Sequence, residues 1–142
     1  MLNTNGKKYP MKYLFITLFV LISLYTCAQV TDWKTEAGFN YSCNYDLDLD
    51  RFTSPPKQYH TTILIDIGSD GSGKFIWYIG ERKNSFTIES AEYQKGKNHK
   101  VIMQCSNYQG GKFEVRFTYS EKEALLLELI NPINNTSVIL SN

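Results

Sequence analysis

Side chains that carry chemistry are scarce in this sequence, which has only two histidines and three cysteines among its 142 residues. His60 and His99 lack the spacing, to one another and to cysteine, that holds zinc. A nucleophile needs a base and an orienting group, and the chain spacing assembles no such set. We therefore predict no catalytic residues, no cofactor and no metal site. A carboxylate-based hydrolase is the alternative, since glutamates are present although nothing singles out a pair.

An excess of positive charge is also missing. The formal net charge is +1, and three lysines (Lys7, Lys8 and Lys12) lie in the first 28 residues, which contain no acidic residue. Without that segment the net charge becomes −2, whereas a nucleic-acid binder needs a basic excess. With 42% hydrophobic and 14% aromatic residues, the chain does not have the composition of a disordered protein. Residues 29–142 are long enough for one domain.

No hydrophobic run is long enough for a transmembrane helix. The apolar run Tyr13–Tyr25 has 13 residues, whereas a spanning helix needs about 20. The run follows the lysines and precedes Ala28, which predicts a signal peptide over residues 1–28 and a periplasmic or secreted domain over residues 29–142. The alternative is a lipid on Cys27, although Tyr25 stands where that signal has a small residue.

Cleavage after Ala28 would leave two cysteines, Cys43 and Cys105. An even pair in an oxidising compartment predicts a disulfide. The alternative is two buried thiols that pack as small hydrophobic side chains.

Alternation of apolar and polar residues with a period of two predicts eight β-strands and no helix. In the first, residues 39–50, the alternation places Phe39, Tyr41 and Cys43 on the inner face. In the fourth the apolar phase shifts between Ile88 and Ala91, which predicts a β-bulge. The other strands are expected over residues 61–67, 74–79, 85–93, 99–106, 112–119, 123–130 and 136–140.

Short connections rich in Gly, Asn and Ser join these strands after residue 60, as in successive hairpins. The predicted fold is all-β: an eight-stranded antiparallel up-and-down meander closing into a small barrel, with a two-sheet β-sandwich as the runner-up. In strand count and connection order this architecture resembles the lipocalins, a likeness that implies a carrier of a small apolar ligand. The Gly-x-Trp signature of that family is absent, because Trp33 follows Thr31-Asp32.

Two motifs suggest ligands but lack essential parts. Residues 68–74 match the start of a phosphate-binding loop, yet Phe75 replaces the hydroxyl residue and a strand follows instead of a helix. Asp46, Asp48 and Asp50 alternate like calcium ligands but lack the glycine and glutamate of an EF-hand. We interpret the first as a hairpin turn and the second as a solvated strand face.

The expected function is that of an exported, non-enzymatic binding or interaction module. Leu64, Ile76 and Tyr78 point outward from two paired strands, which predicts an apolar patch for a protein partner. Leu126, Ile130 and Ile139 form a second outward set, and the segment Val30–Gly38 is expected either to cover one of these patches or to leave it to a partner. A small apolar ligand at the barrel mouth is the alternative, with Tyr41, Trp77 and Tyr119 as the expected contacts. Neither nucleic acid nor an integral membrane segment is expected.

Overall fold

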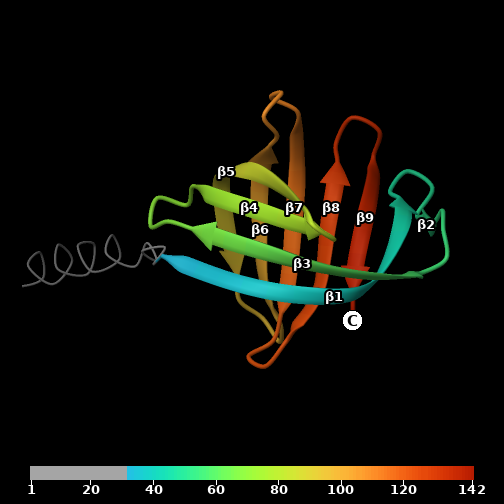
Figure 1. The fold of residues 1–142 in the computed structure, drawn as a ribbon, viewed down its shortest axis with the longest axis horizontal. Coiled ribbons are helices and arrows are strands. Elements are labelled where there is room, and N and C mark those ends of the chain that lie inside the picture. The colour runs from blue at the N-terminus through green and yellow to red at the C-terminus, as the bar shows by residue number, and fades with distance from the viewer. Residues whose placement is uncertain (1–31) are drawn as a thin grey trace, which may run out of the picture.

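The computed structural model describes residues 32–142 and contains strands but no helix in that range. It therefore holds no helix long and apolar enough to cross a membrane within the described part of the chain. The predicted signal peptide and Cys27 lie outside the described residues. In Figure 1 the strands follow one another along the chain as β1 (Trp33–Asp46), β2 (Arg51–Phe52), β3 (Lys57–Ile67), β4 (Gly73–Ile79), β5 (Arg82–Gln94), β6 (His99–Ser106), β7 (Lys112–Tyr119), β8 (Ala124–Asn131) and β9 (Thr136–Ser141).

The strands form one antiparallel sheet that closes into a barrel. From β3 onward each strand pairs with the next, and β1 pairs with both β3 and β9. The eight strands β1 and β3–β9 make the barrel wall, while the short β2 pairs with the end of β1. The predicted eight-stranded meander and its closure are confirmed, and the sandwich is not observed.

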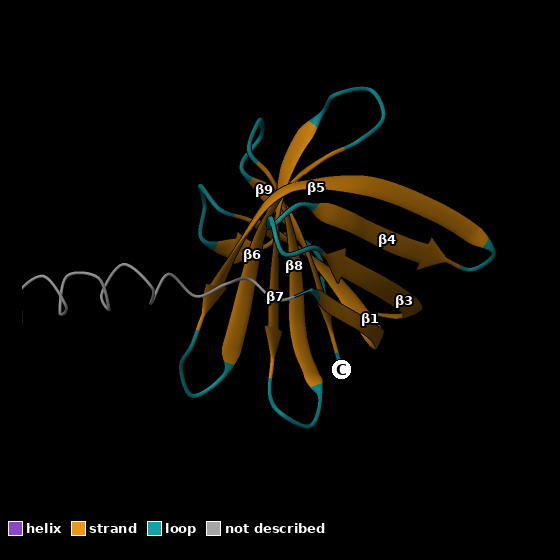
Figure 2. Ribbon diagram, turned by 90° about the vertical axis from the view of Figure 1, so that its left-hand side faces the viewer, coloured by secondary structure: helices purple, strands orange, loops and turns teal. Residues whose placement is uncertain are grey.

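Two long strands, β1 and β5, turn the corners of this barrel. Figures 1 and 2 show β1, β3 and β4 crossing the layer of β6–β9 at a steep angle. β5 pairs with β4 through residues 82–88 and then with β6 through residues 87–94. Its register shifts between Ile88 and Ser90, which confirms the predicted bulge. A bulge bends the strand and raises its twist, which lets β5 pass from one layer to the other.

A bulge in the β1–β3 ladder was not predicted, and the faces of β1 are reversed beyond it. Up to Phe39 the odd-numbered residues point inward, but the register shifts between Phe39 and Tyr41. Beyond the shift, Ser42 lies opposite the core residue Leu140, and Cys43 lies opposite Ile139 on the outer face. The predicted inward placement of Tyr41 and Cys43 is therefore wrong, because the register shift exchanges the inner and outer faces of β1 for the rest of the strand.

The ends of the first predicted strand also differ from the structure. The strand begins at Trp33, so most of the segment Val30–Gly38 belongs to β1 and does not cover a patch as a separate element. It ends at Asp46, whose carboxylate accepts hydrogen bonds from the amides of Asp48 and Leu49. A turn with Asp50 at a positive φ of 49° then leads to β2. The three aspartates consequently do not line one strand face.

Apolar side chains fill the interior of the barrel. Burial of one such side chain contributes about 1.5–3 kcal/mol relative to leaving it in water. All eight barrel strands contribute apolar side chains to this core, including Phe75 of β4 and Ile88 of β5. The largest fully buried side chains are Phe39, Phe75, Phe117, Ile63, Ile65, Ile67, Ile88, Met103, Leu127, Leu140, Val101 and Val115.

Candidate functional site

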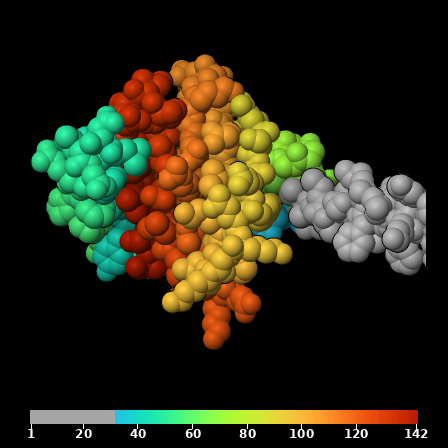
Figure 3. Space-filling model, turned by 180° about the vertical axis from the view of Figure 1, so that it is seen from behind, coloured from blue at the N-terminus to red at the C-terminus, as the bar shows by residue number. Residues whose placement is uncertain are grey.

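The barrel wall is open beside the first half of β1. On one side β1 pairs with β3 along Trp33–Ser42, but on the other side it pairs with β9 only from Tyr41 onward. A cleft of about 550 Å³ occupies this opening, between the first half of β1 and the turn that joins β7 to β8. Figure 3 shows that turn projecting from the body of the protein.

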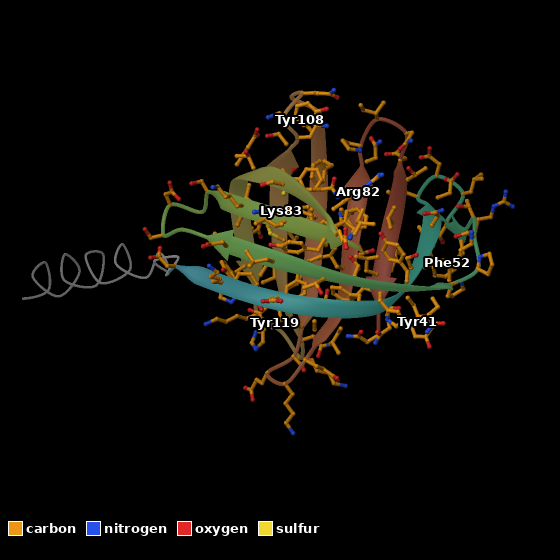
Figure 4. The ribbon with its side chains drawn as sticks, viewed as in Figure 1. Tyr41, Phe52, Arg82, Lys83, Tyr108 and Tyr119 are labelled. Atoms are coloured by element: carbon orange, nitrogen blue, oxygen red, sulfur yellow. The ribbon has the colours of Figure 1, made fainter. Side chains whose placement is uncertain are left out.

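Aromatic rings from four strands meet at this cleft. The Trp33 ring centroid lies 5.6 Å from that of Tyr119 and 5.9 Å from that of Tyr93, which it meets edge to face. The His99 ring lies 5.3 Å from Tyr119, and Phe117 stacks on Tyr119 at 5.4 Å. Trp33, His99 and Tyr119 are only half-buried and line the cleft, whereas Phe117 is buried beneath them. In Figure 4 Tyr119 lies just below β1.

Acidic residues are also among those that line the cleft. Glu36 from β1, and Glu121 and Glu123 from the β7–β8 turn, line the cleft with a single ammonium group, that of Lys122. Three acidic groups against one basic group make the cleft electronegative. Aromatic faces attract cations through their quadrupole, and nearby carboxylates add to this attraction. The site therefore has the chemistry to hold an organic cation.

The hydroxyl of Tyr93 is buried behind the cleft. It has no hydrogen-bond partner among the described residues. Burial, together with a smaller contribution from Tyr119, raises the pKa of Tyr93 to about 12. Burial also raises the pKa of Tyr119. Both phenols are consequently neutral over the physiological range, so the negative charge of the cleft comes from its glutamates.

The structure brings only one of the three predicted barrel-mouth contacts to this cleft. Tyr119 lines it, whereas Tyr41 is 45% exposed beyond the register shift in β1 and does not line the cleft. Trp77 packs against the core away from the cleft, and its indole N–H donates to Thr61 Oγ1 at 2.8 Å. Trp33 and His99 were not among the predicted contacts. The signal for Trp33 was its odd-numbered position, in phase with Ala37 and Phe39.

The predicted outer patch is contiguous but offers little exposed area. Leu64 lies directly opposite Ile76, and Tyr78 lies opposite Thr62 in the same ladder. Ile76 is only 9% exposed, and Leu64 and Tyr78 are half-buried. The second outward set behaves differently: Leu126 and Ile139 line a groove of about 560 Å³ with residues 52–56, between the β2–β3 connection and the outer face of β8–β9.

The predicted disulfide is absent, and both Cys43 and Cys105 are free. The bulge in β1 places Cys43 on the outer face, opposite Ile139, while Cys105 lies in the core opposite Ile88. Because the two thiols point to opposite sides of the barrel wall, they do not meet. Burial raises the pKa of Cys43 and raises that of Cys105 to about 12, with Glu89 adding to the second shift.

Comparisons with known protein families, with curated proteins and with solved structures found no match. Within residues 32–142 no three His, Cys, Asp or Glu side chains gather closely enough to hold a metal ion.

Proposed function

We propose that this protein is an exported, non-catalytic binding protein whose site is the cleft beside the first half of β1. The observation that carries the proposal is the half-buried state of three rings, Trp33, His99 and Tyr119, in a concave opening. Phe39, Phe75 and Phe117 on the inner face are covered by the core. Phe86 and Phe113 are half-buried beside a smaller pocket of about 380 Å³, which no acidic residue lines. Concave sites lined by aromatic rings and a few placed charges are typical of small-ligand and peptide binding.

The interior of the barrel is the less favoured place for a ligand. Large side chains occupy it, and twelve of them are less than 2% exposed. A central ligand of the lipocalin kind would have to displace that packing, at a cost of several kcal/mol. Binding at the open end costs no such repacking, which favours the cleft over both the filled interior and the flat patch around Ile76.

Three probes that share one ring and differ in charge test this proposal: benzylamine, benzyl alcohol and benzoate. Titrated into ¹⁵N-labelled protein, benzylamine should bind most tightly and benzoate least, because the cleft is electronegative. The Trp33 indole signal should shift, while that of Trp77, which is bonded to Thr61, should not.

Matched variants make the result specific. Trp33→Ala should abolish the shift of the His99 signals. Tyr108→Ala removes a ring that is 91% exposed elsewhere on the surface, and it should preserve the shifts of Trp33 and His99. If none of the probes shifts Trp33 or His99, or if the shifts centre on another surface, the proposed site is wrong.

Export is supported by the sequence of residues 1–28, a lysine-rich start followed by a short apolar run and Ala28. The intact mass of the protein recovered from an exporting host should correspond to a chain that begins at Gln29. A mass that retains residues 13–25, or that includes a lipid on Cys27, would contradict this part of the proposal.

A further inference from the structure

We infer that the ligand of the cleft is an extended peptide segment that adds a strand to the free edge of β1 and places a lysine or arginine side chain among the rings. This inference rests on the proposed function and names the class of ligand. It is argued from two observations: one edge of the first half of β1 has no partner among residues 32–142, and acidic residues outnumber basic ones in the lining of the cleft.

The direction of the backbone groups in β1 follows from the ladder beside it. Across the β3–β4 turn the amide of Gly68 donates to the carbonyl of Ser72 at 2.8 Å. Bonding alternates along an antiparallel strand, so the odd-numbered residues of β3 bond toward β1. Their opposite residues in β1 are also odd-numbered, for example Ala37 opposite Ile63. The even-numbered residues of this half of β1 therefore direct their N–H and C=O groups away from β3.

Those even-numbered residues, Lys34, Glu36 and Gly38, face the cleft edge. β9 pairs with β1 only from Tyr41, and no other backbone group among the described residues bonds to this edge. An unpaired strand edge is a template for a further strand, and peptide recognition often uses it. The backbone of Gly38 lies among the residues that line the cleft.

A second open edge, in the first half of β5, shows how the protein protects an edge it does not use. Residues 82–86 pair with β4 but have no partner on the β6 side. Two exposed basic residues, Arg82 and Lys83, stand at that edge (Figure 4). Charged side chains, lysine above all, are a common protection of free edges. At the edge of β1 the one lysine, Lys34, is paired with Asp66 at 3.4 Å.

The charges select a basic segment. A peptide strand along β1 would lie between Glu36 and the two glutamates of the β7–β8 turn, and its alternate side chains would point toward Trp33 and Tyr119. A lysine or arginine there would meet ring faces and carboxylates together. The same basic peptide would be repelled by Arg82 and Lys83 at the edge of β5, because the charge beside that edge is positive.

The test uses a display library of random 12-residue peptides selected against the immobilised protein. We expect enrichment of sequences with lysine or arginine, without proline in the bound core. For an enriched peptide, fluorescence anisotropy should show about tenfold weaker binding to Gly38→Pro, which removes an amide donor that faces the cleft. Gly38→Ala keeps that donor, and a Cβ there would approach no closer than 3.9 Å, to Thr61 O, so its affinity should stay within about twofold.

A second variant tests the charge without changing the strand. Glu121→Gln together with Glu123→Gln should weaken the same peptide and reduce the salt dependence of its binding. Equal binding to Gly38→Pro and Gly38→Ala would overturn strand addition. Enrichment of acidic or uncharged peptides, or of none, would overturn the basic-peptide assignment. If benzylamine still shifts Trp33 in that case, the proposed function stands without this inference; if it does not, both fail.

Discussion

Aromatic side chains line both the interior of the barrel and its open end, but the rings in the interior are covered by other side chains and those at the open end are not. Phe75 in the interior is fully buried and stacks on Phe86 with 5.6 Å between the ring centroids. Trp33 and Tyr119 at the open end have a ring contact of the same length, 5.6 Å, yet both remain half-buried. In both places the rings lie on the inner face of their strands.

The difference lies in the wall. Phe75 belongs to β4, which is paired along both sides, whereas Trp33 belongs to the half of β1 that has no partner toward β9. Rings in a closed wall contribute stability, whereas rings beside an open wall keep a face that the sheet does not cover, and the proposed ligand would occupy that face. The comparison therefore separates positions whose loss affects folding from positions whose loss affects binding.

The largest expected effect is on the folding side of this comparison. Phe75→Ala should lower the free energy of unfolding by about 3–5 kcal/mol, because it removes a fully buried ring and leaves a cavity. Tyr119→Ala should cost clearly less, about 1–2 kcal/mol, since its ring is already half in water. Urea denaturation of both variants measures the difference. Equal losses would mean that the open end is as much a part of the core as the interior.

A smaller effect should separate Tyr93 from the exposed tyrosines at high pH. Burial raises the pKa of Tyr93 in the folded state to about 12, while an unfolded tyrosine ionises near pH 10. The folded state holds the proton more tightly, so this contribution to stability is complete below about pH 10 and is lost as pH rises toward 12.

Urea midpoints measured at rising pH should therefore fall more steeply for the wild type than for Tyr93→Phe. At neutral pH the variant should be as stable as the wild type or up to about 1 kcal/mol more stable, because the removed hydroxyl has no partner among the described residues. Parallel pH profiles for the two proteins would show that the Tyr93 hydroxyl is exposed to water.

The smallest expected effect on stability concerns the cysteines. A reducing agent should leave the melting temperature unchanged, because Cys43 and Cys105 lie on opposite sides of the wall. A thiol reagent should label the half-buried Cys43 slowly in the native protein and Cys105 only after unfolding in urea. Peptide mapping of the labelled sites checks both statements. A lower melting temperature after reduction, together with protection of both cysteines from the thiol reagent, would mean that the disulfide does form.

Most of the barrel could be predicted from alternation alone. Strands β6 and β7 have the predicted bounds, because one face of each packs on the core and the other faces solvent. The bulge of β5 could also be predicted from the sequence, since the apolar positions change from even-numbered to odd-numbered residues after Ile88. Where one face of a strand is buried along its whole length, a period of two carries the register.

The register shift between β1 and β3 is not accompanied by a change in the alternation of apolar and polar residues. Residues alternate without a break from Phe39 to Asp50, although the faces exchange after Phe39 and the strand ends at Asp46. The large residues that then point outward are accommodated on the β1–β2 hairpin, where Tyr45 meets the Phe52 ring at 5.1 Å. The pairing with β3 and with β9 fixes that register, and the pairing with β9 is a property of the closed barrel.

The same reason limits prediction of the site. The inward direction of Tyr119 followed from the alternation in its strand. The cleft, however, exists because β9 pairs only with the second half of β1 and leaves the first half without a partner on that side among the described residues. Trp33 lies 86 residues from Tyr119 in the sequence and meets it only through closure of the barrel, which no local pattern contains. His99, in contrast, lies directly opposite Tyr119 in the β6–β7 hairpin, so its position beside that ring follows from the register of two neighbouring strands.

Hydrogen exchange along β1, followed residue by residue, tests the central claim that this edge is open. The amides of Thr35 and Ala37 bond toward β3 and should exchange slowly, while those of Glu36 and Gly38 face the cleft and should exchange orders of magnitude faster. Beyond the bulge, Cys43 should be protected by β9. Uniformly slow exchange from Thr35 to Gly38 would contradict the account, because it would mean that the edge is already paired.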